Sequence, residues 1–298
     1  MNLEFKIVNK KGLEPYINIL NLLEQEIEYP LKNGKESFVI NHGKKYYPFF
    51  TKQGYKTRFL IIKNKGAVIG SIVAVWKKVY ISTRIYNGLY ASDLKLKLEY
   101  RGKEIVKKCL WYLLLRWPFT KDFKGWDFIY FCAMQKNSKG VDKTFSGIHL
   151  GRLTSPIANF VIFMLDPKIF FNQGFEIIHK GIQQNINLSE KRKKDVLWND
   201  GIKDIIYNKK QEIIRLGHLD PEILSTLNIK RFKNAINEIE SQKNSLVCFA
   251  IDSRDSLKLN WLNQIGAKSE TMCKLFYFSP FSLNLFKSNI IHISTGEI

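Results

Sequence analysis

The sequence has little cysteine and histidine, and neither residue occurs at the spacing of a metal site. The four cysteines are spread over 298 residues, at Cys109, Cys132, Cys248 and Cys273. The five histidines are equally isolated, at His42, His149, His179, His218 and His292. Paired ligands such as Cys-x-x-Cys, which hold structural zinc, do not occur. We therefore expect no metal centre, and we interpret the cysteines in apolar runs as free thiols of a protein in a reducing cytosol.

Long hydrophobic runs are also missing. No segment approaches the roughly 18 consecutive apolar residues of a transmembrane helix. The first residues, MNLEFKIVNKKG, lack the apolar core of a signal peptide. A Gly-x-Ser-x-Gly elbow and a Walker-type phosphate loop are absent too, which excludes two common catalytic signatures. These absences predict a cytoplasmic protein with no membrane partner.

Positive charge is what the sequence has in excess. Lys and Arg number 47 against 27 Asp and Glu, which gives a formal net charge of +20. Lysine is dispersed along the chain, and a lysine-biased genome would explain it without any function. The alternative is an anionic partner, such as a phosphorylated cofactor, a nucleic acid or an anionic lipid surface. Apolar residues make up 45% of the chain, so we expect a sizeable core and no global disorder.

The stretch 89–117 predicts a strand, a turn and a helix, and the rest of the chain is interpreted around it. Three leucines (Leu94, Leu96 and Leu98) alternate with two lysines, which predicts a strand with the leucines on its buried face. Apolar residues then recur at helical spacing over 105–114. The end of this helix is apolar nearly all round, at Leu110, Trp111, Leu113, Leu114 and Leu115. This composition predicts a core helix and not a membrane anchor.

The turn between strand and helix, Arg101-Gly102-Lys103, carries two cations and a glycine. A helix that begins directly after a strand points its first N–H groups at the mouth of the turn. Those donors, the helix dipole and the two cations together favour an anion such as a diphosphate.

The run DLKLKLEYRGKEIVKKCLWYLL, residues 93–114, resembles the acyl-CoA-binding motif of the GCN5-related N-acetyltransferases (GNAT). The family pattern is Arg/Gln-x-x-Gly-x-Gly/Ala after a strand. Arg101 and Gly102 fit it, whereas Glu104 and Val106 occupy the positions of the two small residues. The resemblance implies that acetyl-CoA or another acyl-CoA is the cofactor and that backbone N–H groups of the turn hold its diphosphate. The implied cofactor-binding residues are Leu96, Lys97, Leu98, Arg101, Gly102, Lys103, Glu104, Ile105, Val106 and Asn137.

The order of the expected elements in residues 1–165 is that of a GNAT domain. They are a strand at 4–8, a helix at 13–27, a hairpin of strands 58–63 and 67–76, the strand–turn–helix, and strands at 126–134 and 157–165, with a short helix before the last. Residues 31–58 are expected to be irregular, and 78–86 to add a third strand. The resemblance implies an α/β (α+β) fold, with a mixed, mostly antiparallel twisted sheet flanked by helices.

Residues 166–298 predict a second, smaller α/β half. A helix is expected at 232–239, then a strand at 246–251, a helix at 257–265 closed by Gly266, and a strand at 272–278. This end is similar to the closing part of a GNAT domain, but no second phosphate-binding turn precedes it. We interpret the half as a degenerate GNAT-like repeat, and the alternative is a family-specific extension that completes the first sheet.

The resemblance also implies catalytic roles. In the family, a backbone N–H of the central strand, here at 96–98, stabilises the oxyanion, and a carboxylate deprotonates the amine. Asp93 is the first candidate for the base and Glu99 the second, although Asp93 could equally be a turn residue and Glu99 a solvated one. No tyrosine occupies the position of the general acid, so Tyr130 or Tyr100 substitutes, or the thiolate leaves unassisted. Asn137 lies near the CoA arm or caps a helix.

Two functions follow as hypotheses. The first is an N-acyltransferase, acetyl being the expected acyl group, that acts on a small-molecule or peptide amine. Its acceptor would lie between residues 27–58 and the second half, beside Tyr46, Tyr47 and Phe49. The second is a catalytically inactive GNAT-like scaffold that binds a polyanion such as RNA through its positive surface. No dedicated nucleic-acid motif occurs, and the dispersed lysines indicate no focused groove.

Overall fold

The computed structural model describes residues 1–31, 35–81, 84–116, 119–134, 154–171, 185–189, 194–198, 203–207, 213–226, 229–279, 286 and 289–298. Its strands are β1 (Leu3–Val8), β2 (Tyr29–Leu31), β3 (Glu36–Asn41), β4 (Lys56–Asn64), β5 (Ala67–Ile81), β6 (Arg84–Leu96), β7 (Phe128–Met134), β8 (Ser155–Leu165), β9 (Asn185–Asn187), β10 (Val196–Leu197), β11 (Asp204–Tyr207), β12 (Ile213–Leu219), β13 (Ser245–Asp252), β14 (Thr271–Phe278) and β15 (Ile290–His292). Its α-helices are α1 (Lys10–Leu13), α2 (Ile17–Gln25), α3 (Tyr47–Thr51), α4 (Ile105–Arg116), α6 (Pro221–Thr226), α7 (Ile229–Glu240) and α8 (Ser256–Gln264).

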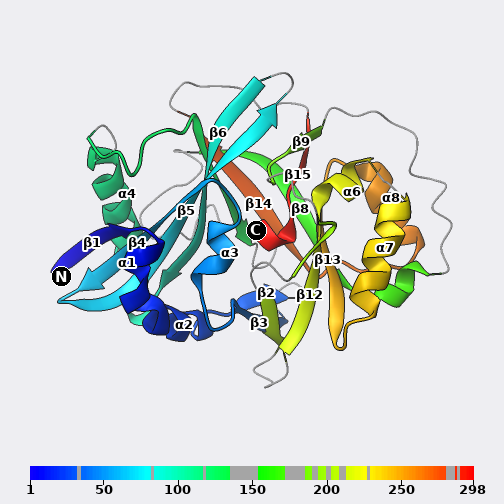
Figure 1. Ribbon diagram of the computed structural model, residues 1–298, viewed down its shortest axis with the longest axis horizontal. Coiled ribbons are helices and arrows are strands. Elements are labelled where there is room, and N and C mark those ends of the chain that lie inside the picture. The colour runs from blue at the N-terminus through cyan, green and yellow to red at the C-terminus, as the bar shows by residue number, and fades with distance from the viewer. Residues whose placement is uncertain are drawn as a thin grey trace.

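The described strands form one continuous, mostly antiparallel sheet. Its order is β1-β4-β5-β6-β7-β14-β8-β13-β12-β11-β3-β2. The pairs β6–β7 and β12–β13 are parallel, and in each case the chain passes through helices between the two strands. Helices α1, α2 and α4 lie toward one end of the molecule and α6, α7 and α8 toward the other (Figure 1). The predicted fold class is therefore confirmed.

Strands from the two predicted halves interleave in this sheet. β14 lies between β7 and β8 and is antiparallel to both. At the other end, β3 of the first half pairs with β11 of the second. The β13–α8–β14 order predicted for the end of the chain is confirmed, and Gly266 closes α8 with φ +74°. The division at residue 165 stays a prediction.

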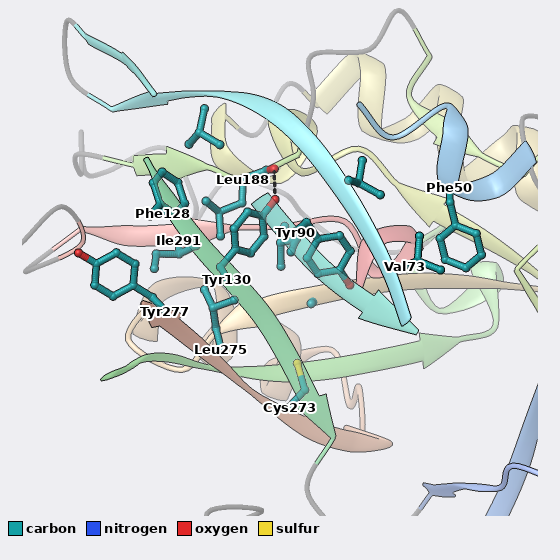
Figure 2. Packing of buried hydrophobic residues seen from close by; sticks show 14 of the residues in the cluster. Phe50, Val73, Tyr90, Phe128, Tyr130, Leu188, Cys273, Leu275, Tyr277 and Ile291 are labelled. Atoms are coloured by element: carbon teal, nitrogen blue, oxygen red, sulfur yellow. Dashed lines mark hydrogen bonds between the residues drawn. The ribbon is translucent and has the colours of Figure 1, made fainter. Parts of the chain in front are cut away.

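The largest hydrophobic core contains side chains from both halves. Val73, Tyr90 and Tyr130 of the first half pack in it with Leu275 and Ile291 of the second (Figure 2). The rings of Tyr90 and Tyr130 stack with their centroids 5.1 Å apart. The fully buried Tyr130 hydroxyl donates a hydrogen bond of 3.2 Å to the carbonyl of Leu188. Burial of this shared core stabilises the two halves together.

Two expectations about secondary structure are wrong. Residues 31–58 are not irregular throughout, because they contain β3 and α3. β3 is a short apolar run whose strand conformation is stabilised by pairing with the distant β11, which no local pattern reveals. Residues 78–86 are no separate strand, because β5 continues to Ile81 and β6 begins at Arg84.

Helix α4 forms where the sequence predicted it, but the prediction of a core helix is wrong. Ile105 and Cys109 are fully buried. Trp111, Leu114 and Leu115 are instead exposed to 57%, 47% and 69%. The helix therefore packs through one face only, and its last turns present large apolar side chains to solvent.

The four cysteines are free thiols, which confirms the prediction for Cys109, Cys132 and Cys248. Burial raises the pKa of Cys109 to about 12 and that of Cys248 to about 11. Both therefore stay protonated at neutral pH and act as small apolar core residues.

Candidate functional site

The candidate site begins where β6 leaves β7. The parallel pairing of the two strands covers only Gly88–Tyr90 opposite Phe128–Tyr130. Beyond Tyr90, the described ladder of β6 continues with β5 alone. A bulge interrupts that ladder, because two residues of β6, Asp93 and Leu94, lie opposite one residue of β5.

The bulge changes which side chains of β6 are buried. Asp93 adopts a left-handed backbone conformation, with φ +51°. After it, Lys95 is only 1% exposed, whereas Leu98, which lies beyond the end of β6 on a 3₁₀ turn, is 63% exposed. The expectation that the three leucines share one buried face is therefore wrong. An alternating pattern shifts by one residue at a bulge, and a buried lysine requires partners that the local sequence does not show.

Those partners form a buried ionic cluster, which we define as Glu24, His42, Tyr46, Asp93 and Lys95. The Lys95 ammonium lies 2.7 Å from Glu24 Oε1 and 2.9 Å from Asp93 Oδ2. Glu24 Oε1 also contacts His42 Nδ1, and the Tyr46 hydroxyl donates to Asp93 Oδ2. The side chains of Glu24, Asp93 and Lys95 are 5%, 6% and 1% exposed. Ion pairs and hydrogen bonds thus connect helix α2, the loop after β3 and the bulge of β6.

The cluster stabilises its own charges. Burial alone would raise the pKa of Glu24, but the neighbouring His42 and Lys95 lower it to about 2. Burial alone would lower the pKa of Lys95, but Asp93 and Glu24 outweigh it, and the pKa is raised. Both groups therefore stay ionised across the physiological pH range. The contacts of Asp93 position the bulge, and its predicted role as a base stays a prediction.

The backbone after the bulge orients its amides in two directions. The Lys97 N–H donates to the carbonyl of Ile69 on β5 at 2.9 Å. The Leu96 carbonyl accepts from Arg101 Nε at 3.1 Å, on the opposite edge. Because the N–H and C=O of one strand residue point the same way, the Leu96 N–H also points away from β5. Among the predicted oxyanion donors, Leu96 thus faces the edge where β6 has separated from β7.

The turn after β6 presents its amides to the surroundings. Gly102 and Glu104 have left-handed backbones, with φ +76° and +56°. Within the described chain, none of the N–H groups of residues 102–106 donates a hydrogen bond. Helix α4 starts at Ile105, so these groups lie at its N-terminal end. A Cβ added at Gly102 would meet no heavy atom within 4 Å. These donors at a helix start form an open anion-binding geometry.

The two residues that depart from the motif do not fill this turn. The side chain of Glu104 is 54% exposed and contacts the Lys107 ammonium on α4 at 3.4 Å. Val106 is half-buried, and Arg101 and Lys103 are exposed. Ile105 is the turn residue that packs into the core, beside Leu96. The turn is therefore accessible, with two cations beside it.

The other predicted site residues are dispersed. Glu99 is exposed on the short 3₁₀ turn Leu98–Tyr100. The Tyr100 hydroxyl accepts from Asn64 Nδ2 at 3.3 Å, and Tyr130 is buried in the shared core. Asn137 lies outside the described residues, as does the short helix expected after it.

The aromatic residues expected beside the acceptor are packed in the core. Tyr46 is fully buried, Tyr47 is 8% exposed, and Phe49 lies 4.7 Å from the His42 ring. Sequence analysis missed Glu24 and His42. One signal for Glu24 was available, because it lies on the predicted apolar face of its helix, directly after the buried Leu23.

Comparisons with known proteins agree with this architecture. Neither a family model nor a curated relative matches the sequence. Crystal structures of Saccharomyces cerevisiae N-myristoyltransferase with bound myristoyl-CoA are similar in fold. One aligns with a TM-score of 0.56 at 10% identity, over 94% of this chain and 79% of the enzyme. Another aligns with a TM-score of 0.54 at 12% identity, over 98% and 89%. The chain therefore has a GNAT-type fold over nearly its whole length.

Proposed function

We propose that the protein is an acyl-CoA-dependent N-acyltransferase that binds the CoA diphosphate at the turn between β6 and α4. The observation that carries the proposal is the open turn 102–106, whose backbone N–H groups stand at the start of α4. The fold supports it, because the similar N-myristoyltransferase structures contain myristoyl-CoA.

The turn offers several attractions to a diphosphate. The N–H groups of residues 102–106 can each donate a hydrogen bond, and the dipole of α4 favours negative charge at the same point. Arg101 and Lys103 add two exposed cations. The Nε of Arg101 also ties the turn to the end of β6 through the Leu96 carbonyl. This hydrogen bond connects the turn to the strand that precedes it.

Acyl transfer needs more than a bound donor. The amine nitrogen must attack the thioester carbonyl as the C–S bond breaks, so an N–H donor must stabilise the developing oxyanion. We assign this role to the Leu96 amide, because it faces the separated edge of β6. The amine must also lose a proton, and Asp93 and Glu99 are the proposed acceptors.

The proposed acyl donor is an acyl-CoA, and the length of its acyl chain is to be measured. The motif resemblance points to acetyl-CoA, and the ligand of the similar structures points to myristoyl-CoA. The acceptor is a small-molecule or peptide amine. Release of free CoA thiol would be followed with acetyl-CoA, octanoyl-CoA and myristoyl-CoA and a pool of primary amines and peptides.

Amine-dependent thiol release from one of these donors is the expected result, and mass spectrometry would show the acylated amine. The variants Asp93→Asn and Glu99→Gln compare the two proposed bases. The variant that removes the catalytic base should have a kcat at least tenfold lower than that of the natural protein. If no donor reacts and none raises the melting temperature at millimolar concentration, the proposal is wrong.

One observation favours the polyanion-binding alternative, namely the net charge of +20. In that case the protein would bind RNA with a steep log–log dependence on salt and would ignore acyl-CoA. Binding measurements with RNA and with acyl-CoA therefore distinguish the two functions.

A further inference from the structure

The outward face of α4 carries a cluster of large apolar side chains. Trp111, Leu114, Leu115 and the following Phe119 are exposed to 57%, 47%, 69% and 83%. We call these four residues the α4 apolar patch. The first three are spaced i, i+3 and i+4, so they share one side of the helix. Exposed apolar residues are common singly, but four within nine consecutive positions indicate an interaction surface.

Packing of the helix does not account for this patch. α4 is attached to the sheet through Ile105 and Cys109, both fully buried, and through the partly buried Leu113. The patch lies on the other side of the helix. Its side chains would be expected to be polar if this face met only water.

Exposed cations lie close to the patch in the chain. Lys108 and Arg116 are exposed on α4 itself, and Lys121 and Lys124 are exposed on the segment that follows it. The one nearby exposed carboxylate on that segment, Asp122, is paired with Arg58 at 2.7 Å. The face therefore combines exposed aromatic and leucine side chains with a net positive border.

We propose that the α4 apolar patch docks onto an anionic lipid surface. Trp and Leu on one side of a helix, with a Phe three residues after its end and with Lys and Arg nearby in the chain, are side chains that bind at the headgroup–acyl boundary. The helix would lie on the membrane and not cross it. Among the described residues no helix has the length and hydrophobicity to span a bilayer.

Charge argues for lipid over a second copy of the chain. Two copies meeting through this patch would bring their cationic borders together, and each chain carries a net charge of +20. An anionic headgroup layer neutralises the same border. This inference does not depend on the proposed acyl transfer, because the patch occupies the last turns of α4 and the diphosphate turn precedes its first.

Cosedimentation with vesicles tests the proposal. The full chain would be mixed, at 150 mM salt, with vesicles of phosphatidylcholine alone or of phosphatidylcholine and phosphatidylserine at 3:1. The test variant is Trp111→Ser/Phe119→Ser. The matched control is Tyr80→Ser/Ile85→Ser, which removes two side chains that are 61% and 56% exposed elsewhere.

We expect the natural protein to partition at least tenfold more strongly onto the phosphatidylserine vesicles than onto phosphatidylcholine alone. The patch variant should lose at least tenfold of this partitioning, and the control variant should stay within twofold. Equal thermal melting of both variants would show that they are folded. Lys121→Glu/Lys124→Glu should also weaken binding without affecting the patch itself.

The proposal is overturned if the natural protein does not prefer the anionic vesicles, or if the patch variant binds them as well as the control does. A natural protein that elutes as a dimer, with a monomeric patch variant and no vesicle binding by either, would assign the face to self-association and overturn it too.

Discussion

Replacing Glu104 with glycine should strengthen acyl-CoA binding and slightly stabilise the protein. Glu104 has φ +56°, a left-handed conformation that glycine adopts without steric cost, and it occupies a motif position where the GNAT pattern has a small residue. Its side chain is 54% exposed and contacts Lys107, which is itself 44% exposed, so little packing is lost. The carboxylate also stands beside the proposed diphosphate.

Two terms set the size of the effect. A non-glycine residue in the left-handed region destabilises the folded state by about 1–2 kcal/mol, and glycine removes this strain. Glycine also loses more conformational entropy on folding, which offsets about 0.5–1 kcal/mol of the gain. The net gain in stability is then about 0.5 kcal/mol, or about 1 °C in melting temperature for a chain of this length. Removing a like charge beside a diphosphate is worth about 1 kcal/mol after screening, which is about fivefold in Kd.

Titration calorimetry with CoA and scanning calorimetry of the free protein measure the two terms separately. Glu104→Gln removes the charge but keeps the strained backbone, so it should gain the affinity and not the stability. Glu240→Gln, an exposed carboxylate on α7, is the control for net charge. If Glu104→Gly and Glu104→Gln bind CoA no more tightly than the control, the diphosphate does not lie at this turn. If the glycine variant is less stable than the glutamine variant, the assignment of strain at this position is wrong.

Three further predictions concern the core. Lys95→Met should destabilise the protein by about 3–5 kcal/mol in urea unfolding, because it removes the one ammonium that pairs with both buried carboxylates and leaves them only His42 and the Tyr46 hydroxyl as partners, whereas Lys97→Met should cost less than about 0.5 kcal/mol; equal effects would refute the ionic cluster. Burial lowers the pKa of His292 from 6.5 to about 4, so the unfolded state binds more protons between these values and stability falls as pH drops from about 6.5 to 4. His292→Gln should remove about 3 kcal/mol of this acid sensitivity, and an unchanged pH profile would contradict the assignment. Gly54→Ala should cost at least about 1–3 kcal/mol, since its Cβ would lie 2.2 Å from the carbonyl oxygen of Trp76, and a melting temperature like that of the natural protein would refute the close approach.

Local patterns predicted the central part of the site well. The order strand, turn and helix at residues 84–116 is visible in the sequence, because each element depends on residues close to it in the chain. Gly102 was identified as the permissive residue of the turn, and it has φ +76°. The strand predicted at 272–278 is confirmed as β14, whereas β15, which follows it, was not predicted.

Long-range contacts explain what the sequence did not show. Lys95 and Glu24 are separated by 71 positions, so their pairing cannot be inferred from alternation within β6. The bulge at Asp93 places Lys95 in the interior, and Leu98 is exposed because β6 ends at Leu96 and a 3₁₀ turn follows. The position of β14 between β7 and β8 likewise depends on side-chain packing across the whole chain. The exposure of α4 was mispredicted because an apolar sequence does not show whether other elements of the fold cover each face of the helix.

Binding of unacylated CoA to the free protein tests the central claim most directly. The account predicts saturable binding of one CoA per chain by titration calorimetry. It also predicts at least tenfold weaker binding by Arg101→Ala and unchanged binding by Arg84→Ala, which removes the same charge at the opposite end of β6. No saturable heat at millimolar CoA, or equal affinity in the two variants, would contradict it.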